Sequence, residues 1–332
     1  MKIAKRCLLT AIIIALSAPF CSGAQLDKVP EFEKDILLIV PFNPGAVSDA
    51  YAQMIKQIGE KYIDHFILLE YKPGGNTSVG INFMLTKPHD GYTISIPGNN
   101  PEYTVATGQT DTYDEFSYVS IGSPVSEQSV LIVPPGSPFK SLQDVLEFAA
   151  QHPGQLNWGG ANTLGFNHFF ALETMKNGNV EFNYVPYDNA GEVVLAVLGK
   201  NVDVGTVTFS TALPYYNSGE VRAIAQSLPE RDMESLADVP TIYETPGLEY
   251  ERYGIPFVAA RPLIAHAATP EAMLEAWDRL MEKIVSDPAW IAWVEKRNVI
   301  KNSHIKGADA TKLMRNNTDR IRKIYETMAA PQ

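Results

Sequence analysis

The chain has 332 residues, more than one hydrophobic core ordinarily holds, and its composition is that of a globular protein, so two domains are expected. The formal net charge of −11 argues against nucleic acid as a partner, because an acidic surface repels phosphates. Both cysteines, Cys7 and Cys21, lie near the start of the chain, so the sequence after them excludes disulfides, thiolate catalysis and cysteine-bound metal.

The first two dozen residues have the pattern of a secretory signal peptide. A basic start over residues 1–6 precedes an apolar run over 8–16 that is too short to span a bilayer comfortably. Small residues at 22–24 then resemble a cleavage site before Gln25. This predicts a signal peptide over 1–24 and a periplasmic mature protein; a retained membrane anchor is the alternative.

Strands and helices alternate after this segment. Apolar runs predict strands over 36–42, 65–71 and 92–96. Apolar residues at helical spacing predict helices over 51–62 and 81–86. This β-α-β-α-β order predicts an α/β fold with a mostly parallel sheet and helices on its faces.

A second series repeats the same order, so two similar α/β domains are expected. Its strands are predicted around 130–133, 156–163, 182–187, 202–209 and 221–227. Its helices are predicted over 142–152, 166–177, 191–198 and 211–218. The tail from Pro270 onward has the apolar spacing of amphipathic helices.

The turn after the first strand contains small residues and no catalytic side chain. Ligands of parallel sheets bind beyond the carboxyl ends of strands, and the first N–H groups of a helix favour a carboxylate or phosphate. Gly45 and Ala46 leave room for a ligand, Ser48 can cap the helix or donate its hydroxyl, and Asp49 suits the first turn. Such turns often only connect, so this pattern alone leaves both roles open.

The second series has a similar turn in "NWGGANTLGFNHF", with Asn162 and Thr163 at the expected start of a helix. The turns at Gly45–Asp49 and Ala161–Thr163 are expected to present free N–H groups to one ligand. Two such helix starts, one from each domain, would face each other across a binding cleft.

Several motifs carry a family resemblance. Residues 41–49 read PFNPGAVSD, close to P-F-x-P-G-G-x-S/T-D. "YKPGGNTSVG", "KPHDGYTISI", "HPGQLNWGG", "NYVPYDNAGEVVLAVLGKNVDV" and "LADVPTIYE" follow in order. With these motifs the chain resembles the Bug family, the extracytoplasmic solute receptors of tripartite tricarboxylate transporters.

This resemblance implies a periplasmic-binding-protein fold, type II-like, that closes on a small organic acid. It implies a first domain of residues 25–124 plus 252–332 and a second domain of 125–251. The partners implied are integral membrane transporter subunits. The protein is expected to be a monomer and no enzyme, with no cofactor, no catalytic residue and no metal ligand.

The candidate ligand-binding residues follow from the two turns and the family motifs. His168 and Tyr187 could each contact ligand, but a helix-supporting hydrogen bond and packing at the sheet edge are equally good explanations. The full candidate set is Phe42, Asn43, Gly45, Ala46, Val47, Ser48, Asp49, Ser78, Asn99, Ala161, Asn162, Thr163, His168, Tyr187 and Thr208.

The sequence departs from the family pattern at several of these positions. Ala46 replaces a usual glycine, and Ser78 replaces a usual asparagine. Asp188-Asn189 replace the familiar Lys-Gly, and an acidic residue often found near Thr208 is absent. We expect the distal part of the pocket to be less positive and more apolar, which would suit a monocarboxylate, an aromatic acid or an otherwise less charged ligand.

Two other classes of function compete with transport. The chain lacks H-E-x-x-H, G-x-S-x-G and the glycine-rich phosphate-binding motifs, which argues against an exported enzyme acting on a small carboxylate. A receptor that engages a periplasmic sensor kinase would use the same closed cleft, so the sequence does not separate sensing from transport.

Protein isolated from the periplasm should lack the residues before about Gln25, because the signal is removed on export. Intact mass spectrometry measures this directly. A mass that includes a lipid on Cys21 would show instead that the segment is a lipoprotein signal.

Overall fold

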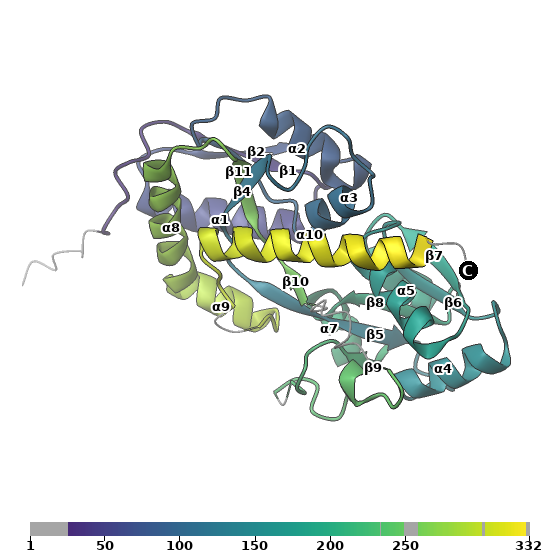
Figure 1. Cartoon of the computed structure of the whole chain (residues 1–332). Helices are drawn as coiled ribbons and strands as arrows, with labels where there is room; N and C mark the ends of the chain where they lie inside the picture. Colours follow the sequence, from purple (N-terminus) through teal and green to yellow (C-terminus); the bar gives the residue numbers. More distant parts are fainter. Residues whose placement is uncertain (1–25, 233, 249–257, 301–302, 330–332) are drawn as a thin grey trace, which may run out of the picture.

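The computed structural model describes residues 26–232, 234–248, 258–300 and 303–329, so the predicted signal segment lies outside the described residues. The described chain forms two α/β lobes, each with helices packed on its own sheet (Figure 1). The first lobe contains a five-stranded sheet and the second a six-stranded sheet.

The first lobe has the strand order β2-β1-β3-β11-β4, in which β11 alone runs antiparallel to its neighbours. Its strands are β1 (Ile36–Val40), β2 (Ile67–Tyr71), β3 (Thr93–Ser95), β4 (Tyr118–Gly122) and β11 (Leu263–His266). Its helices are α1 (Val47–Tyr62), η1 (Gly75–Thr77), α2 (Ser78–Leu85), α3 (Asn100–Ala106), α8 (Glu271–Ser286) and α9 (Pro288–Lys296).

The second lobe has the order β10-β5-β8-β6-β7, with β9 also pairing to β5. β5 runs antiparallel to β8, β9 and β10. Its strands are β5 (Ser126–Val133), β6 (Asn157–Ala161), β7 (Asn183–Tyr187), β8 (Val204–Thr208), β9 (Arg222–Gln226) and β10 (Val258–Ala260). Its helices are α4 (Leu142–Gln151), α5 (Phe166–Gly178), α6 (Ala190–Leu198), α7 (Phe209–Asn217) and η2 (Ile242–Glu244).

Successive side chains of a strand point to opposite faces of its sheet. The central strands are buried on both faces, because helices cover both sides of each sheet. In β1, Leu38 packs with α1 and α8, whereas Ile39 packs with α2 on the other face. In β5, Val130 packs with α6 and α7, and Leu131 packs with α4 and α5. The apolar runs that predicted these strands therefore reflect helices on both sides of each sheet.

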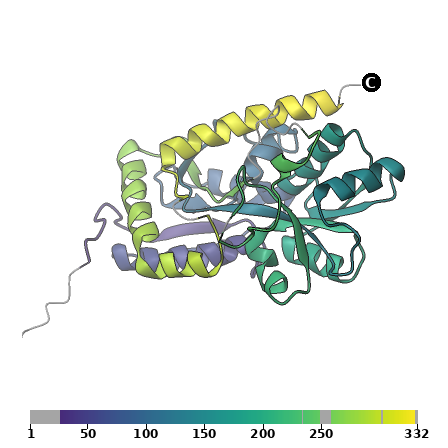
Figure 2. The same ribbon diagram turned by 90° about the horizontal axis from the view of Figure 1, so that it is seen from below.

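The lobes are joined by two crossings of the chain and by one long helix. The chain passes into the second lobe from β4 to β5 and returns to the first from β10 to β11. The reversed strand of each sheet, β5 in the second lobe and β11 in the first, therefore directly follows a crossing. Helix α10 (Gly307–Ala329) lies across both lobes (Figures 1 and 2). Its Thr311 contacts β4, while Ile321 and Ile324 enter the core of the second lobe.

The predicted fold of two α/β domains is confirmed, and both sheets are mixed, because the reversed strands β11 and β5 pair antiparallel with all their neighbours. The prediction missed the strands β4, β10 and β11, which pair with distant parts of the chain, and the short helix α3, which packs against α10. The division into a first domain of 25–124 plus 252–332 and a second domain of 125–251 stays a prediction. The end of α10 packs in the second lobe, although that division assigns it to the first domain.

Two carboxylic acids are buried where α3, α5 and α10 pack together. Glu102 is 2% exposed, and burial raises its pKa to about 8 against the opposing effect of a hydrogen bond from Asn317. Glu173 is 1% exposed, and burial also raises its pKa to about 8. Neither carboxylate oxygen of Glu173 has a partner among the described residues. Both acids are therefore protonated in the folded protein at neutral pH.

Replacing Glu173 by Gln should raise the melting temperature at pH 8 and have little effect at pH 4. The acid ionises near pH 4.5 when unfolded but near pH 8 when folded, so the folded state binds the extra proton and loses stability as the pH rises through this window. Thermal unfolding at both pH values measures the effect, with exposed Glu181→Gln as the control. An equal change at both pH values would contradict this account.

Candidate functional site

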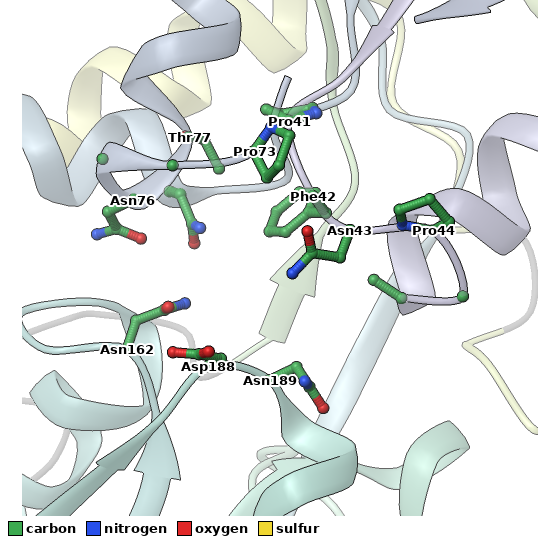
Figure 3. Close-up of a pocket in the computed structure, with 15 residues that line it drawn as sticks. Pro41, Phe42, Asn43, Pro44, Pro73, Asn76, Thr77, Asn162, Asp188 and Asn189 are labelled. Atoms are coloured by element: carbon green, nitrogen blue, oxygen red, sulfur yellow. The ribbon is translucent and has the colours of Figure 1, made fainter. Parts of the chain in front are cut away.

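A cleft between the lobes contains two adjoining cavities. The hinge-side cavity, of about 220 Å³, reaches Arg261 beside the chain crossings, and the loop-side cavity, of about 590 Å³, is bordered by the segment Pro73–Thr77. Residues from both lobes line both cavities, as Figure 3 shows for the loop-side cavity. The shared lining residues are Phe42, Gly45, Ala46, Asn100, Asn162, Asp188 and Asn189.

The turn after β1 is shaped by its own carboxylate. Asp49 accepts a hydrogen bond from the N–H of Gly45 at 2.7 Å and another from the hydroxyl of Tyr71 at 2.8 Å. Gly45 has φ +85°, a conformation that glycine adopts without strain. The N–H of Ala46 donates to the carbonyl of Asn43 at 3.2 Å. The expectation of free N–H groups at Gly45 and Ala46 is therefore wrong, because the turn itself uses both.

The unpaired donors of this turn come next, at the start of helix α1. Helix α1 begins at Val47, and no side chain caps it. The N–H groups of Val47 and Ser48 find no acceptor among the described residues, and both residues line the hinge-side cavity. With the positive end of the helix dipole behind them, these groups favour an anion in the cavity.

The second lobe presents the start of α6 to the same cavity. Asn189 caps this helix by accepting the N–H of Glu192 at 3.1 Å, and the Glu192 carboxylate accepts the N–H of Asp188 at 3.3 Å. These bonds fix the backbone and leave the N–H groups of Ala190 and Gly191 without an acceptor among the described residues. Both residues line the hinge-side cavity, so it receives unpaired donors from each lobe.

The turn before α5 is held rigidly. Asn162 and Leu164 both have positive φ, and the N–H of Asn162 donates to the carbonyl of Tyr187 at 2.9 Å. The N–H of Leu164 donates to Nδ1 of His168 at 2.9 Å. Burial lowers the pKa of His168 to about 4, so its imidazole is neutral and able to accept this bond at pH 7. The helix-supporting explanation for His168 therefore fits the structure.

Arg261 forms part of the floor of the hinge-side cavity. Its Nε donates to Glu127 at 2.9 Å, and the two side chains are only 11% and 1% exposed. The hydroxyl of Ser210, at the start of α7, donates to the other oxygen of Glu127. This buried ion pair ties β5 to the segment between β10 and β11, and its two charges cancel at the floor of the cleft.

The loop-side cavity is lined by amides. Figure 3 shows the side chains of Asn43 and Asn76 from the first lobe above those of Asn162 and Asp188 from the second. Among the described lining residues, neither Lys, Arg nor His borders this cavity. The lack of positive charge fits the expectation, and amide side chains share the lining with Pro41, Phe42, Pro44 and Pro73, so polar and apolar surface are about equal.

Comparison with known proteins places this architecture in a family. A model of the tripartite tricarboxylate transporter family receptor, TctC, matches residues 51–329. The chain belongs to this receptor family. The resemblance to the Bug family read from the sequence is thereby confirmed, and the family is one of solute-binding receptors, so this receptor is not an enzyme.

Relatives of this receptor span most of its length. A UPF0065 protein in the tcbD-tcbE intergenic region of Pseudomonas sp. (strain P51) is 25% identical over 291 residues, 86% of this chain and 83% of the relative. MatC from Rhodopseudomonas palustris with bound malate is 19% identical, has a TM-score of 0.76 and covers 88% of this chain and 99% of its own. R. palustris Rpa4515 with adipate is 18% identical, has a TM-score of 0.74 and covers 90% and 96%.

Most of the sequence-predicted site residues of the receptor line the cleft. Those that do are Phe42, Asn43, Gly45, Ala46, Val47, Ser48, Asn99, Ala161, Asn162 and Thr208. Five others lie outside the described lining: Asp49, Ser78, Thr163, His168 and Tyr187. Whether any of them touches a ligand stays a prediction.

The five outside the lining have structural reasons to be there. Asp49 closes its own turn, and His168 supports the turn before α5. Ser78 bonds to the hydroxyl of Tyr113 at 3.0 Å, and Tyr187 packs against the α6 side of the second sheet. Thr163 lies within the turn before α5 and is exposed.

Sequence reasoning missed several lining residues. Ala190 and Gly191 follow a readable signal, since a strand end, Asn189 and Glu192 three residues later form a capping pattern. Arg261 gave no local signal, because only the return crossing of the chain brings it to the cleft.

None of the described helices combines the length and apolar composition that crossing a membrane requires. Within the described ranges, no cluster of three His, Asp or Glu side chains is placed to hold a metal ion. The expectation that binding needs neither metal nor cofactor stays a prediction.

Replacing Asp49 by Asn should destabilise the receptor by roughly 1–3 kcal/mol, because it weakens the charge-assisted bonds to Gly45 and Tyr71. Chemical denaturation measures the loss. The control is Glu271→Gln, which removes an exposed first-turn charge from α8. Equal losses in the two variants would mean that only helix-dipole effects are involved.

Proposed function

We propose that this receptor captures a small carboxylate in the hinge-side cavity and delivers it to the integral membrane subunits of a tripartite tricarboxylate-type transporter, working in the periplasm. The observation that carries the proposal is the convergence of unpaired N–H groups from α1 and α6, one helix from each lobe, on one cavity. Membership of the receptor family and the malate and adipate named for two structural relatives support it.

The proposed attraction of the carboxylate comes from groups inside the cleft and not from the overall charge of the protein. The acidic chain gives an anion no overall attraction, so donors within the cleft must hold it. Each hydrogen bond to a carboxylate contributes about 1.5–3 kcal/mol, and the α1 and α6 dipoles add to this. Because the donors come from both lobes, one carboxylate would bridge them and favour the closed arrangement.

A thermal-shift screen of small organic acids, amino acids and aromatic acids, followed by calorimetry on each hit, tests this function. Ligands that bind the folded protein raise its melting temperature. A carboxylate should bind and be recovered unchanged. Stabilisation by neutral sugars or cations alone, or conversion of the bound acid into a product, would contradict the proposal.

Replacing Val47 by Pro should weaken carboxylate binding about tenfold while leaving the fold intact. Val47 is the first residue of α1, where proline is tolerated, and Ala46 has the extended backbone that a following proline needs. The change removes one N–H donor, and its loss corresponds to about 1.4 kcal/mol. Calorimetry measures it.

Val47→Ala is the matched control, because it loses the same packing but keeps the N–H group. Equal affinities of the two variants would show that this N–H does not hold the ligand.

A further inference from the structure

We propose that Asp188 sets the ligand class of the cleft, favouring a carboxylate that also carries an ammonium group and rejecting a second carboxylate. The inference rests on the proposed function, since it assumes that one carboxylate occupies the donors of α1 and α6. It concerns the other end of the ligand.

The ionisable groups of the cleft leave one charge uncompensated. Among the described residues that line the two cavities, Asp188 and Arg261 alone carry a full charge. Arg261 is neutralised by Glu127, with which it forms a buried ion pair. Asp188 forms no ion pair within the described part of the chain, so the cleft offers a distal ligand group a negative charge and no free positive one.

The backbone of Asp188 is fixed while its side chain remains available. Its N–H is held by Glu192, and the next residue, Asn189, caps α6. The residue is exposed and lines both cavities, two residues before the first of the unpaired donors at Ala190 and Gly191. Figure 3 shows its carboxylate on the floor of the loop-side cavity, beside Asn162 and below the first-lobe loops.

The neighbouring groups suit an ammonium. The amide oxygens of Asn43 and Asn162 can accept N–H bonds and carry no positive charge that would compete for Asp188. Thr77 is 2% exposed, lines the same cavity, and its hydroxyl has no partner among the described residues. A carboxylate at this place would meet a like charge without a compensating cation, whereas an ammonium would complete an ion pair.

The test compares acids that differ only at the distal end. For chains of three to six carbons, calorimetry compares the simple monocarboxylate, the ω-amino acid and the dicarboxylate, with α-amino acids as a further set. The wild-type receptor should bind the best amino acid at least tenfold more tightly than the dicarboxylate of the same length.

Asp188→Asn, which keeps the size of the side chain, should reduce that preference at least tenfold by weakening amino-acid binding and admitting dicarboxylates. Glu181→Gln is the charge control, because Glu181 is exposed on the same lobe and borders neither cavity of the cleft. Its preference should match that of the wild type.

The outcomes separate the inference from the proposed function. Dicarboxylates that bind the wild type as well as amino acids do, or a preference unchanged in Asp188→Asn, would overturn the role of Asp188 and leave the carboxylate receptor standing. Failure of every acid to bind would overturn the proposed function, and the inference with it.

Discussion

The first N–H groups of a helix cannot be satisfied within that helix, and in this protein the fold collects such groups in one place. Strand β1 of the first sheet and strand β7 of the second each end at the cleft, and helices α1 and α6 begin there. The turns around them are already satisfied, since Asp49 closes one and Asn189 with Glu192 closes the other. What remains unpaired are the donors that line the cavity. The site is therefore made of backbone geometry, with side chains that fix the backbone rather than perform chemistry.

Residues at the two crossings of the chain form the floor of the cleft. Glu127 lies on β5 and Arg261 follows β10, so their buried ion pair joins the outgoing and the returning crossing. Breaking such a pair by removing one partner leaves an uncompensated buried charge, which is costly. Because Glu127 neutralises Arg261, the guanidinium at the floor of the cleft does not offer a ligand anion a free positive charge. In the proposed binding mode, selectivity depends on the helix starts at one end of the cleft and on the amide-rich loops with Asp188 at the other.

Much of this fold could be predicted from sequence, because the strands that matter are buried on both faces and appear as continuous apolar runs, and because α1 has clear helical spacing. The first turn could be located from its small residues between a buried strand and a helix, but only the family motif, and not the turn itself, pointed to a binding role. The predicted turn, Gly45–Asp49, contains the unpaired N–H groups of Val47 and Ser48, but Gly45 and Ala46 are not free, and nothing local shows that Asp49 turns back to bind Gly45. Arg261 and β11 could not be found, since their partners lie more than a hundred residues earlier in the chain.

The proposed function depends most directly on which backbone amides a carboxylate contacts. NMR of the uniformly labelled protein, with residue-specific amide exchange measured with and without a bound acid, resolves this question. We expect the amides of Val47, Ser48, Ala190 and Gly191 to shift together and to become protected on binding, from both lobes at one ligand concentration. Protection confined to one lobe, or to amides away from these two helix starts, would contradict it.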